Sequence, residues 1–229
     1  MVQRLPETCY SITSKERRSA SFPTKRLDPG SWRRSATSCD ELRAAGERPY
    51  AIPTGGSVPI GAVGFVAMVA ELLAQLVTAG EDPSRLYFPT GSLGTQAGLV
   101  VGVRAFSAPF AVYGVAVEHP VEQLIADGVT LANGTAELLG TSQRFSVTVI
   151  TIDGAFIGAA YGVPTDEGIE AIRLLAKTEA VFLDPVYSGK AMAALISHAR
   201  VGQLDPNEAV VFLHTGGGPS LFATGTTLV

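Results

Sequence analysis

Residues 88–98 read Phe88-Pro89-Thr90-Gly91-Ser92-Leu93-Gly94-Thr95-Gln96-Ala97-Gly98. They follow a short strand-like run at 86–88 and precede a run at 99–105 that is typical of a helix. Three glycines and three hydroxyl side chains fall between Thr90 and Gly98, so the backbone N–H groups of this turn can converge. The N-terminal end of the following helix adds partial positive charge. The sequence therefore predicts an anion-binding turn of the kind that holds a phosphate group.

Strand and helix signals alternate on both sides of this turn. Further helices are expected at 60–79, 121–139, 167–177 and 188–201. Further strands are expected at 110–117, 145–152, 181–183 and 209–214. Alternation of this kind produces a mostly parallel sheet with helices on both faces. The predicted fold class is therefore α/β, with a mostly parallel open sheet.

The segment 60–79 is the longest apolar stretch of the chain. Because it is apolar almost all round, we expect a helix that is buried on more than one face. Glu71 and Gln75 interrupt it, so we do not interpret it as a membrane span, and no membrane partner is expected.

Composition limits the classes of protein to which the chain can belong. It has 229 residues, of which 46% are hydrophobic and 17% are charged, as in a well-buried enzyme domain. The net charge of −4 argues against a nucleic-acid partner. Two cysteines, Cys9 and Cys39, cannot form a disulfide framework, which favours a cytoplasmic location. No Cys or His cluster has metal-ligand spacing, so no metal site is expected.

The N-terminal part differs from the rest in charge. Residues 1–48 hold ten of the seventeen Lys and Arg residues, and residues 1–39 show neither helical nor strand periodicity. We interpret 1–39 as a disordered or non-homologous leader and 40–229 as the folded domain. A basic nucleic-acid-binding tail and a mitochondrial presequence are alternatives, but acidic residues at Glu7, Glu16 and Asp28 disfavour both.

Four segments together resemble one family of enzymes. They are residues 52–57 (Ile-Pro-Thr-Gly-Gly-Ser), the 90–98 turn, residues 183–190 (Leu-Asp-Pro-Val-Tyr-Ser-Gly-Lys) and residues 212–217 (Phe-Leu-His-Thr-Gly-Gly). Their order resembles the D-cysteine desulfhydrase and 1-aminocyclopropane-1-carboxylate deaminase family of pyridoxal-phosphate enzymes, from about residue 40 onward. The resemblance implies the large domain of the tryptophan-synthase β-like fold. It also places the cofactor at the carboxyl ends of the strands.

The resemblance implies which residues bind the cofactor, pyridoxal 5′-phosphate. Its phosphate group would be held by Thr90, Gly91, Ser92, Gly94 and Thr95. Thr215 is similar to the hydroxyl residue near the pyridine nitrogen, where it would tune the cofactor as an electron sink. The alternative interpretation of the 90–98 segment is a tight glycine turn before a helix.

The resemblance also implies two catalytic tyrosines and one residue that separates the branches of the family. Tyr187 is similar to the active-site tyrosine, and Tyr161 to a second one; a phenol beside the substrate can move protons. Taken alone, each tyrosine is more typical of a half-buried packing residue. Deaminases of the family carry Glu after the tyrosine, whereas this chain has Ser188, which favours the desulfhydrase branch and a place beside the cofactor.

The family's catalytic lysine motif, Asn-Lys-x-Arg-Lys, and its small domain have no counterpart. The chain has four lysines, of which Lys190 matches a recurring lysine of the family but not the catalytic one. Lys15, within Ser14-Lys15-Glu16-Arg17-Arg18, echoes the spacing without the surrounding glycines. We therefore expect a truncated protein in which the small domain is largely missing.

These observations predict a lyase that converts D-cysteine, or a related small amino acid, to pyruvate, ammonia and sulfide, impaired by the truncation. A 1-aminocyclopropane-1-carboxylate deaminase, an enzyme that eliminates sulfite from cysteate and a non-catalytic remnant of the family are the alternatives. The resemblance also implies a possible homodimer.

Overall fold

The computed structural model describes residues 7–11, 19–22 and 39–223, and Lys15 lies outside these ranges. The chain divides into two compact units, Met1–Val58 and Pro59–Val229.

The first unit contains a small antiparallel sheet. Strand β1 (Glu7–Ser11) pairs with β2 (Ser19–Phe22) and with β3 (Pro49–Ala51), which gives the order β2-β1-β3. Residues 39–44 are helical, and a 3-10 turn, η1, covers Thr54–Gly56. Strands β1 and β2 lie where we expected no periodic structure, because backbone pairing forms these short strands without alternating apolar residues. That 1–39 is separate from the cofactor-binding domain stays a prediction.

The second unit is built on a parallel sheet of four strands in the order β6-β5-β4-β7. The strands are β4 (Pro83–Thr90), β5 (Ala111–Ala116), β6 (Thr151–Asp153) and β7 (Ala209–Phe212). All three neighbouring pairs run parallel, so the carboxyl ends of the strands share one edge. The predicted α/β class and parallel sheet are confirmed.

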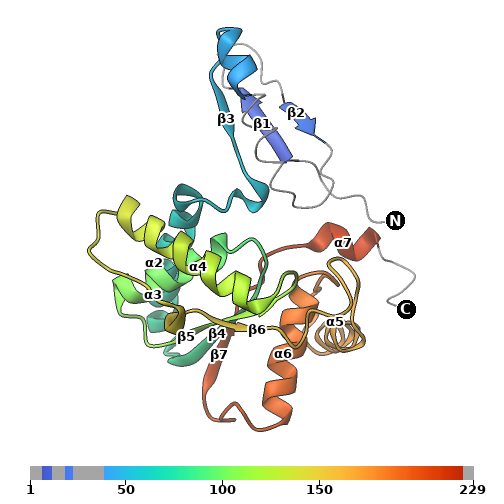
Figure 1. Cartoon of the computed structure of the whole chain (residues 1–229). Helices are drawn as coiled ribbons and strands as arrows, with labels where there is room; N and C mark the ends of the chain where they lie inside the picture. The colour runs from blue at the N-terminus through green and yellow to red at the C-terminus, as the bar shows by residue number, and fades with distance from the viewer. Residues whose placement is uncertain (1–6, 12–18, 23–38, 224–229) are drawn as a thin grey trace. The chain divides into compact units, whose positions relative to one another are not determined.

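Helices cover both faces of this sheet (Figure 1). Helices α2 (Pro59–Ala79), α3 (Gly94–Phe106) and α4 (Val121–Leu138) lie on one side, and α5 (Asp166–Glu179) and α6 (Ser188–Arg200) on the other. A short helix, α7 (Gly218–Ala223), follows β7. Successive side chains of β4 point to opposite faces of the sheet. Leu86 and Phe88 are buried in the core formed with α2, α3 and α4, and Tyr87 is buried against α6.

Two predicted strands differ in the structure. Within residues 145–152 only a 3-10 turn, η2 (Val147–Val149), and the last two residues, which enter β6, are regular. Residues 181–183 form no strand, although Leu183 is fully buried beneath α5 and α6. Only Phe145, Ile150 and Leu183 of these two segments are buried, whereas Val147, Val149, Val181 and Phe182 are exposed. Residues with β-propensity form no strand here, because no neighbouring strand pairs with them.

Helix α2 is less buried than expected. Its buried residues are Ala62, Val66 and Val69, whereas Ile60 and Val77 are exposed. The helix therefore packs through one face, and the prediction of burial on several faces is wrong. By length and composition alone, α2 is able to cross a membrane. The expectation that the protein has no membrane partner stays a prediction.

The contact between α2 and α3 depends on Gly98. A Cβ atom at this position would lie 2.6 Å from the Phe65 Cβ atom and would also clash with the Ala62 carbonyl oxygen, so the helix backbones can approach only at a glycine. At Gly64, on α2, an added Cβ atom would have no other atom within 4 Å.

We expect Gly98→Ala to lower the free energy of unfolding by about 1–3 kcal/mol, because the added methyl group overpacks the core. The matched control, Gly64→Ala, is expected to be neutral or to stabilise the protein by up to about 1 kcal/mol through helix propensity. Denaturant unfolding followed by circular dichroism measures both. Equal stability of the two variants would contradict the proposed close packing.

Candidate functional site

A cavity of about 210 Å³ lies at the carboxyl edge of the sheet, where β4 and β7 end. Its walls come from the turn after β4, the start of α6 and the loop after β7. The lining residues are Pro89, Thr90, Gly91, Ser92, Leu93, Thr95, Tyr187, Thr215, Gly216 and Gly217. Open α/β sheets bind ligands at this edge, so the position alone makes the cavity a candidate site.

The cavity brings together most of the site residues that the sequence predicted. Those that line it are Thr90, Gly91, Ser92, Thr95, Tyr187 and Thr215. Three predicted residues do not line it: Gly94 is buried at the start of α3, Tyr161 is hydrogen-bonded to Tyr187, and Ser188 is buried in a turn.

The uncapped N-terminus of α3 borders the cavity. Helix α3 begins at Gly94, earlier than its strongly apolar part predicts, and no side chain caps it. The first N–H groups of a helix have no intrahelical acceptor, so they are available to an anion. Leu93 reaches this geometry through a left-handed backbone with φ of 71°, which is costly for a residue with a Cβ atom. Its buried side chain packs with Ala116 and Leu124, which holds the turn in place.

Thr90 provides the test of whether the wall fits a phosphate group. Its side chain is buried, and its Oγ1 atom has no hydrogen-bond partner. An unpaired buried hydroxyl costs about 1–3 kcal/mol, which an oxygen atom of a bound group would recover. At the next position, Gly91, a Cβ atom would lie 3.3 Å from Val117 Cγ2, so a larger residue would crowd the turn. With no Asp or Glu in its lining, the cavity wall fits a phosphate.

Asp184 holds the far side of the cavity in place, although the sequence analysis did not single it out. Its Oδ2 atom accepts hydrogen bonds from the N–H groups of Val186 and Tyr187, at 2.8 and 2.9 Å. The Ser220 hydroxyl of α7 donates to the same oxygen at 3.1 Å. Asp184 therefore fixes the backbone of Tyr187 and ties α7 to the start of α6. Asp side chains commonly accept hydrogen bonds from backbone N–H groups two or three residues later, so an Asp just before the predicted helix was the sequence signal for this role.

Gly217 is needed because it lies against Asp184. A Cβ atom at 217 would lie 2.5 Å from Asp184 Cγ, and the residue has a left-handed φ of 91°. The loop after β7 can therefore approach the buried carboxylate only with glycine at this position.

Ser188 serves the same turn. Its hydroxyl donates to Asp184 Oδ1 at 2.6 Å, and its N–H donates to the same oxygen at 2.8 Å. The hydroxyl also accepts from the Asp184 N–H at 2.8 Å. Because the side chain is fully buried by these contacts, the structure places it inside the turn and not in the cavity wall. Contact between Ser188 and the cofactor stays a prediction, and this geometry does not favour it.

Tyr187 and Tyr161 form a pair whose hydroxyl groups are hydrogen-bonded to each other. Their rings meet edge to face, with centroids 5.9 Å apart. Burial, followed by the hydrogen bond with Tyr161, raises the pKa of Tyr187 well above its usual value. Tyr187 therefore remains protonated at neutral pH, as a neutral phenol in the cavity lining.

No lysine side chain lines the cavity among the residues that the structure describes. Lys177 is exposed on α5. Lys190 is fully buried on α6, and its Nζ atom donates to the Ile157 carbonyl at 2.6 Å. Burial lowers the pKa of Lys190, and the nearby Asp184 partly opposes the shift. The candidate Lys15 lies outside the described residues.

His214 and the acidic groups add no further ligand site. The Gly216 N–H donates to His214 Nδ1 at 3.2 Å, so His214 Nε2 donates to the Phe182 carbonyl at 2.9 Å. The ring therefore holds the loop and does not line the cavity. In residues 7–11, 19–22 and 39–223, no group of three His, Cys, Asp or Glu side chains is arranged to hold a metal ion.

Comparison with known proteins gives one family and several similar structures. The family described as "Pyridoxal-phosphate dependent enzyme" matches residues 22–216. A crystal structure of an ACC deaminase homologue is 32% identical, with a TM-score of 0.78 over 90% of this chain and 61% of that chain. The present chain therefore spans less than two thirds of that protein's length.

Two other solved structures match more distantly. Isoform 2 of threonine deaminase from Solanum lycopersicum, in its processed form, is 17% identical, with a TM-score of 0.47 over 72% of this chain and 49% of that one. An L-serine ammonia-lyase of the fungus Rhizomucor miehei is 17% identical, with a TM-score of 0.47 over 73% and 56%.

The tyrosine pair predicts a distinct alkaline titration. Because the pKa of Tyr187 is raised above that of an unfolded tyrosine, near 10, its stabilising contribution is present below pH 10 and is lost as the pH rises further. Absorbance titration of tyrosinate should show a late component that Tyr187→Phe removes.

Tyr161→Phe should move the late component to lower pH, because the hydrogen bond is the second cause of the shift. Tyr113, whose pKa burial also raises, provides the control, since Tyr113→Phe should leave the Tyr187 component unchanged. An identical titration of Tyr187→Phe and the wild type would contradict the assignment. Circular dichroism at each pH confirms that the protein stays folded.

Proposed function

Because the chain belongs to the pyridoxal-phosphate dependent enzyme family, we propose that its cavity at the ends of β4 and β7 binds pyridoxal 5′-phosphate for a lyase reaction of the D-cysteine desulfhydrase type. The reaction would release sulfide and yield pyruvate and ammonia. The observation that carries the proposal is the buried, unpaired Thr90 hydroxyl beside the uncapped N-terminus of α3. Since the chain spans 61% of the length of the similar protein, the activity of a whole enzyme is part of the proposal.

Binding of the cofactor would use both walls of the cavity. The phosphate would be held by Thr90, Gly91, Ser92, Gly94 and Thr95, and Thr215 would contact the ring from the opposite wall. The bound cofactor supplies an electron sink that weakens the bonds at the α-carbon of an amino acid. The absence of acidic residues from the lining favours the binding of a dianionic phosphate.

The tyrosine pair would orient the leaving group by hydrogen bonding. Tyr187 lines the cavity and keeps its hydroxyl proton at neutral pH, so it would donate a hydrogen bond to the sulfur of the leaving group without transferring the proton. Tyr161, hydrogen-bonded to Tyr187, would fix the orientation of that hydroxyl group. The backbone of Tyr187 is fixed by the turn that Asp184 organises.

Ser188 is the residue that supports the desulfhydrase branch over the deaminase branch. Glutamate in its place would put a second carboxylate next to Asp184 at a fully buried position, and like charges at that distance are unfavourable. Deaminase remains the second candidate, because the protein that is 32% identical is described as an ACC deaminase homologue. A non-catalytic remnant is the third candidate, since no lysine lines the cavity among the described residues.

The proposed cofactor site is tested by Thr90→Val in the full chain. The variant should bind pyridoxal 5′-phosphate, and inorganic phosphate, about tenfold more weakly, because the hydroxyl that contacts the phosphate is lost. Its stability should be unchanged or higher, since an unpaired buried hydroxyl is removed. Thr178→Val on the exposed part of α5 is the matched control. Quenching of the intrinsic fluorescence and thermal unfolding provide the two readouts; unchanged affinity would refute the site.

The reaction is tested separately. After loading with cofactor and reduction with borohydride, peptide mapping should place a pyridoxyl group on one lysine if the chain is catalytic. Sulfide and ammonia released from D-cysteine would support the lyase, and turnover of the cyclopropane amino acid alone would favour the deaminase. Tight cofactor binding without an adduct or turnover would identify a remnant. A cytoplasmic location, a homodimer and a small amino-acid substrate complete the proposal.

A further inference from the structure

A second cavity lies at the opposite edge of the sheet, where β5 and β6 begin. Its volume is about 480 Å³, more than twice that of the candidate cofactor cavity and within the range of small-molecule sites. The lining residues are Val100, Val103, Arg104, Ser107, Ala108, Phe110, Ala111, Val112, Arg144, Phe145, Val149 and Thr151. We call it the arginine cavity.

The walls of the arginine cavity are mostly apolar. Val100, Phe110, Val112 and Phe145 are buried core residues, and each presents part of its surface to the cavity. Val149, at 42% exposure, lies near solvent. Walls of this kind favour a ligand with an apolar chain or ring.

Arg104 and Arg144 are the only charged residues in this lining. Neither pairs with a carboxylate in the part of the chain that the structure describes, whereas Arg200 pairs with Glu170 at 2.6 Å. From residue 49 onward the chain has seven basic and fifteen acidic residues, so two arginines without an acidic neighbour in the lining stand out. They give the arginine cavity a positive charge that an anion would complement.

Local structure holds both arginines on rigid supports. Arg104 lies in the last turn of α3, where the helix dipole favours a cation. The Gln143 side chain donates to the Arg104 carbonyl at 3.4 Å, and Arg144 uses one guanidinium nitrogen to donate to the Gln143 carbonyl at 2.8 Å. Asn133 of α4 anchors the backbone of Phe145 through two hydrogen bonds, at 2.9 and 3.0 Å.

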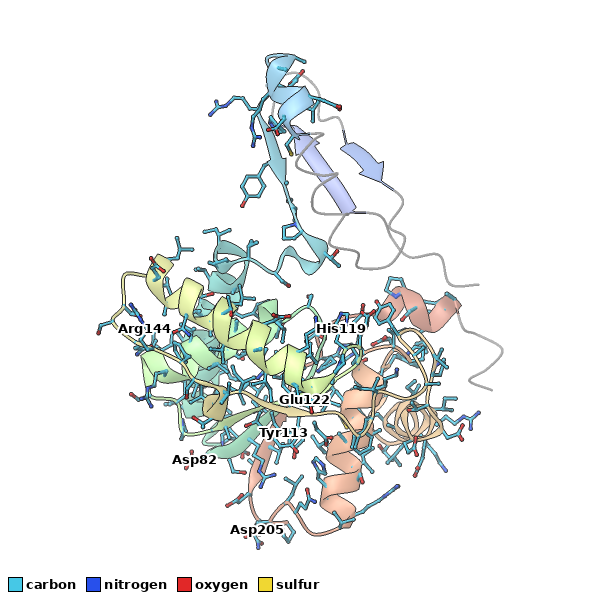
Figure 2. All side chains as sticks on the ribbon, in the orientation of Figure 1. Asp82, Tyr113, His119, Glu122, Arg144 and Asp205 are labelled. Carbon is cyan, nitrogen blue, oxygen red and sulfur yellow. The ribbon has the colours of Figure 1, made fainter. Side chains whose placement is uncertain are left out.

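The arginine cavity is separate from the candidate cofactor site. Gly94 and Arg104 are ten residues apart on α3, or about 15 Å along the helix axis. Figure 2 shows Arg144 and His119 near opposite ends of α4, and His119 follows the carboxyl end of β5. A ligand in one cavity therefore does not occupy the other.

We propose that the arginine cavity binds a hydrophobic carboxylate, with the apolar chain or ring against the valines and phenylalanines and the carboxylate at the two guanidinium groups. Arginine pairs with carboxylates through two parallel hydrogen bonds, which gives the site its selectivity for the anion. The proposal does not depend on cofactor binding.

The test uses 4-phenylbutyrate with the full chain, measured by calorimetry and by saturation-transfer NMR. Saturable binding with a dissociation constant below about 1 mM is expected. The neutral analogue 4-phenylbutanol and the small anion acetate should each bind at least about tenfold more weakly. The alcohol lacks the carboxylate that would contact the arginines, and acetate lacks the apolar chain and ring. Raising the salt concentration should weaken binding of the carboxylate.

Arg104→Gln and Arg144→Gln should each weaken binding of 4-phenylbutyrate about tenfold or more. Arg173→Gln, an exposed position on α5 with the same change in charge, is the matched control and should bind like the wild type. Circular dichroism confirms folding of each variant. No saturable binding, equal binding of the alcohol, or unchanged binding by both cavity variants would overturn the proposal.

Discussion

The Asp184 carboxylate is fully buried, yet it accepts hydrogen bonds from backbone or side-chain groups of Val186, Tyr187, Ser188 and Ser220. A buried charge is tolerated only where donors surround it, so these segments must meet in one geometry. That geometry sets the start of α6, the place of Tyr187 and the approach of the loop at Gly217. One half of the candidate cofactor cavity therefore depends on a residue that does not line it.

Helix α3 connects the two cavities of the second unit. Its N-terminus, uncapped beyond the strained Leu93, belongs to the candidate phosphate site, and its last turn carries Arg104. The opposite ends of the helix dipole suit these roles, since the N-terminus favours an anion and the C-terminus favours a cation. Gly98 and Gly102 let α2 pack closely against α3, so the same helix is rigidly supported between its two functional ends.

Local chemistry explains which features the sequence predicted. The 90–98 turn could be predicted because its glycines, its hydroxyl residues and the following helix are neighbours in the chain. The parallel sheet could be predicted because strand and helix signals alternate along the chain. The irregular backbone at 145–150 and 181–183 was missed because residues with β-propensity occur there without a neighbouring strand to pair with. The arginine cavity was missed because Arg104 and Arg144 are distant in the sequence and line one cavity only in the folded protein. The place of Ser188 was missed because spacing does not tell which carboxylate takes its hydroxyl.

The order of strands in the sheet has a consequence for synthesis of the chain. Strand β4 lies between β5 and β7, and its Leu86 pairs with Val211, more than a hundred residues later. Such a long-range contact forms slowly, because a large loop must close first. Until β7 leaves the ribosome and docks, one edge of β4 has unpaired backbone groups that can recruit a strand from another nascent chain. Prompt docking of β7 therefore protects this edge from aggregation during translation.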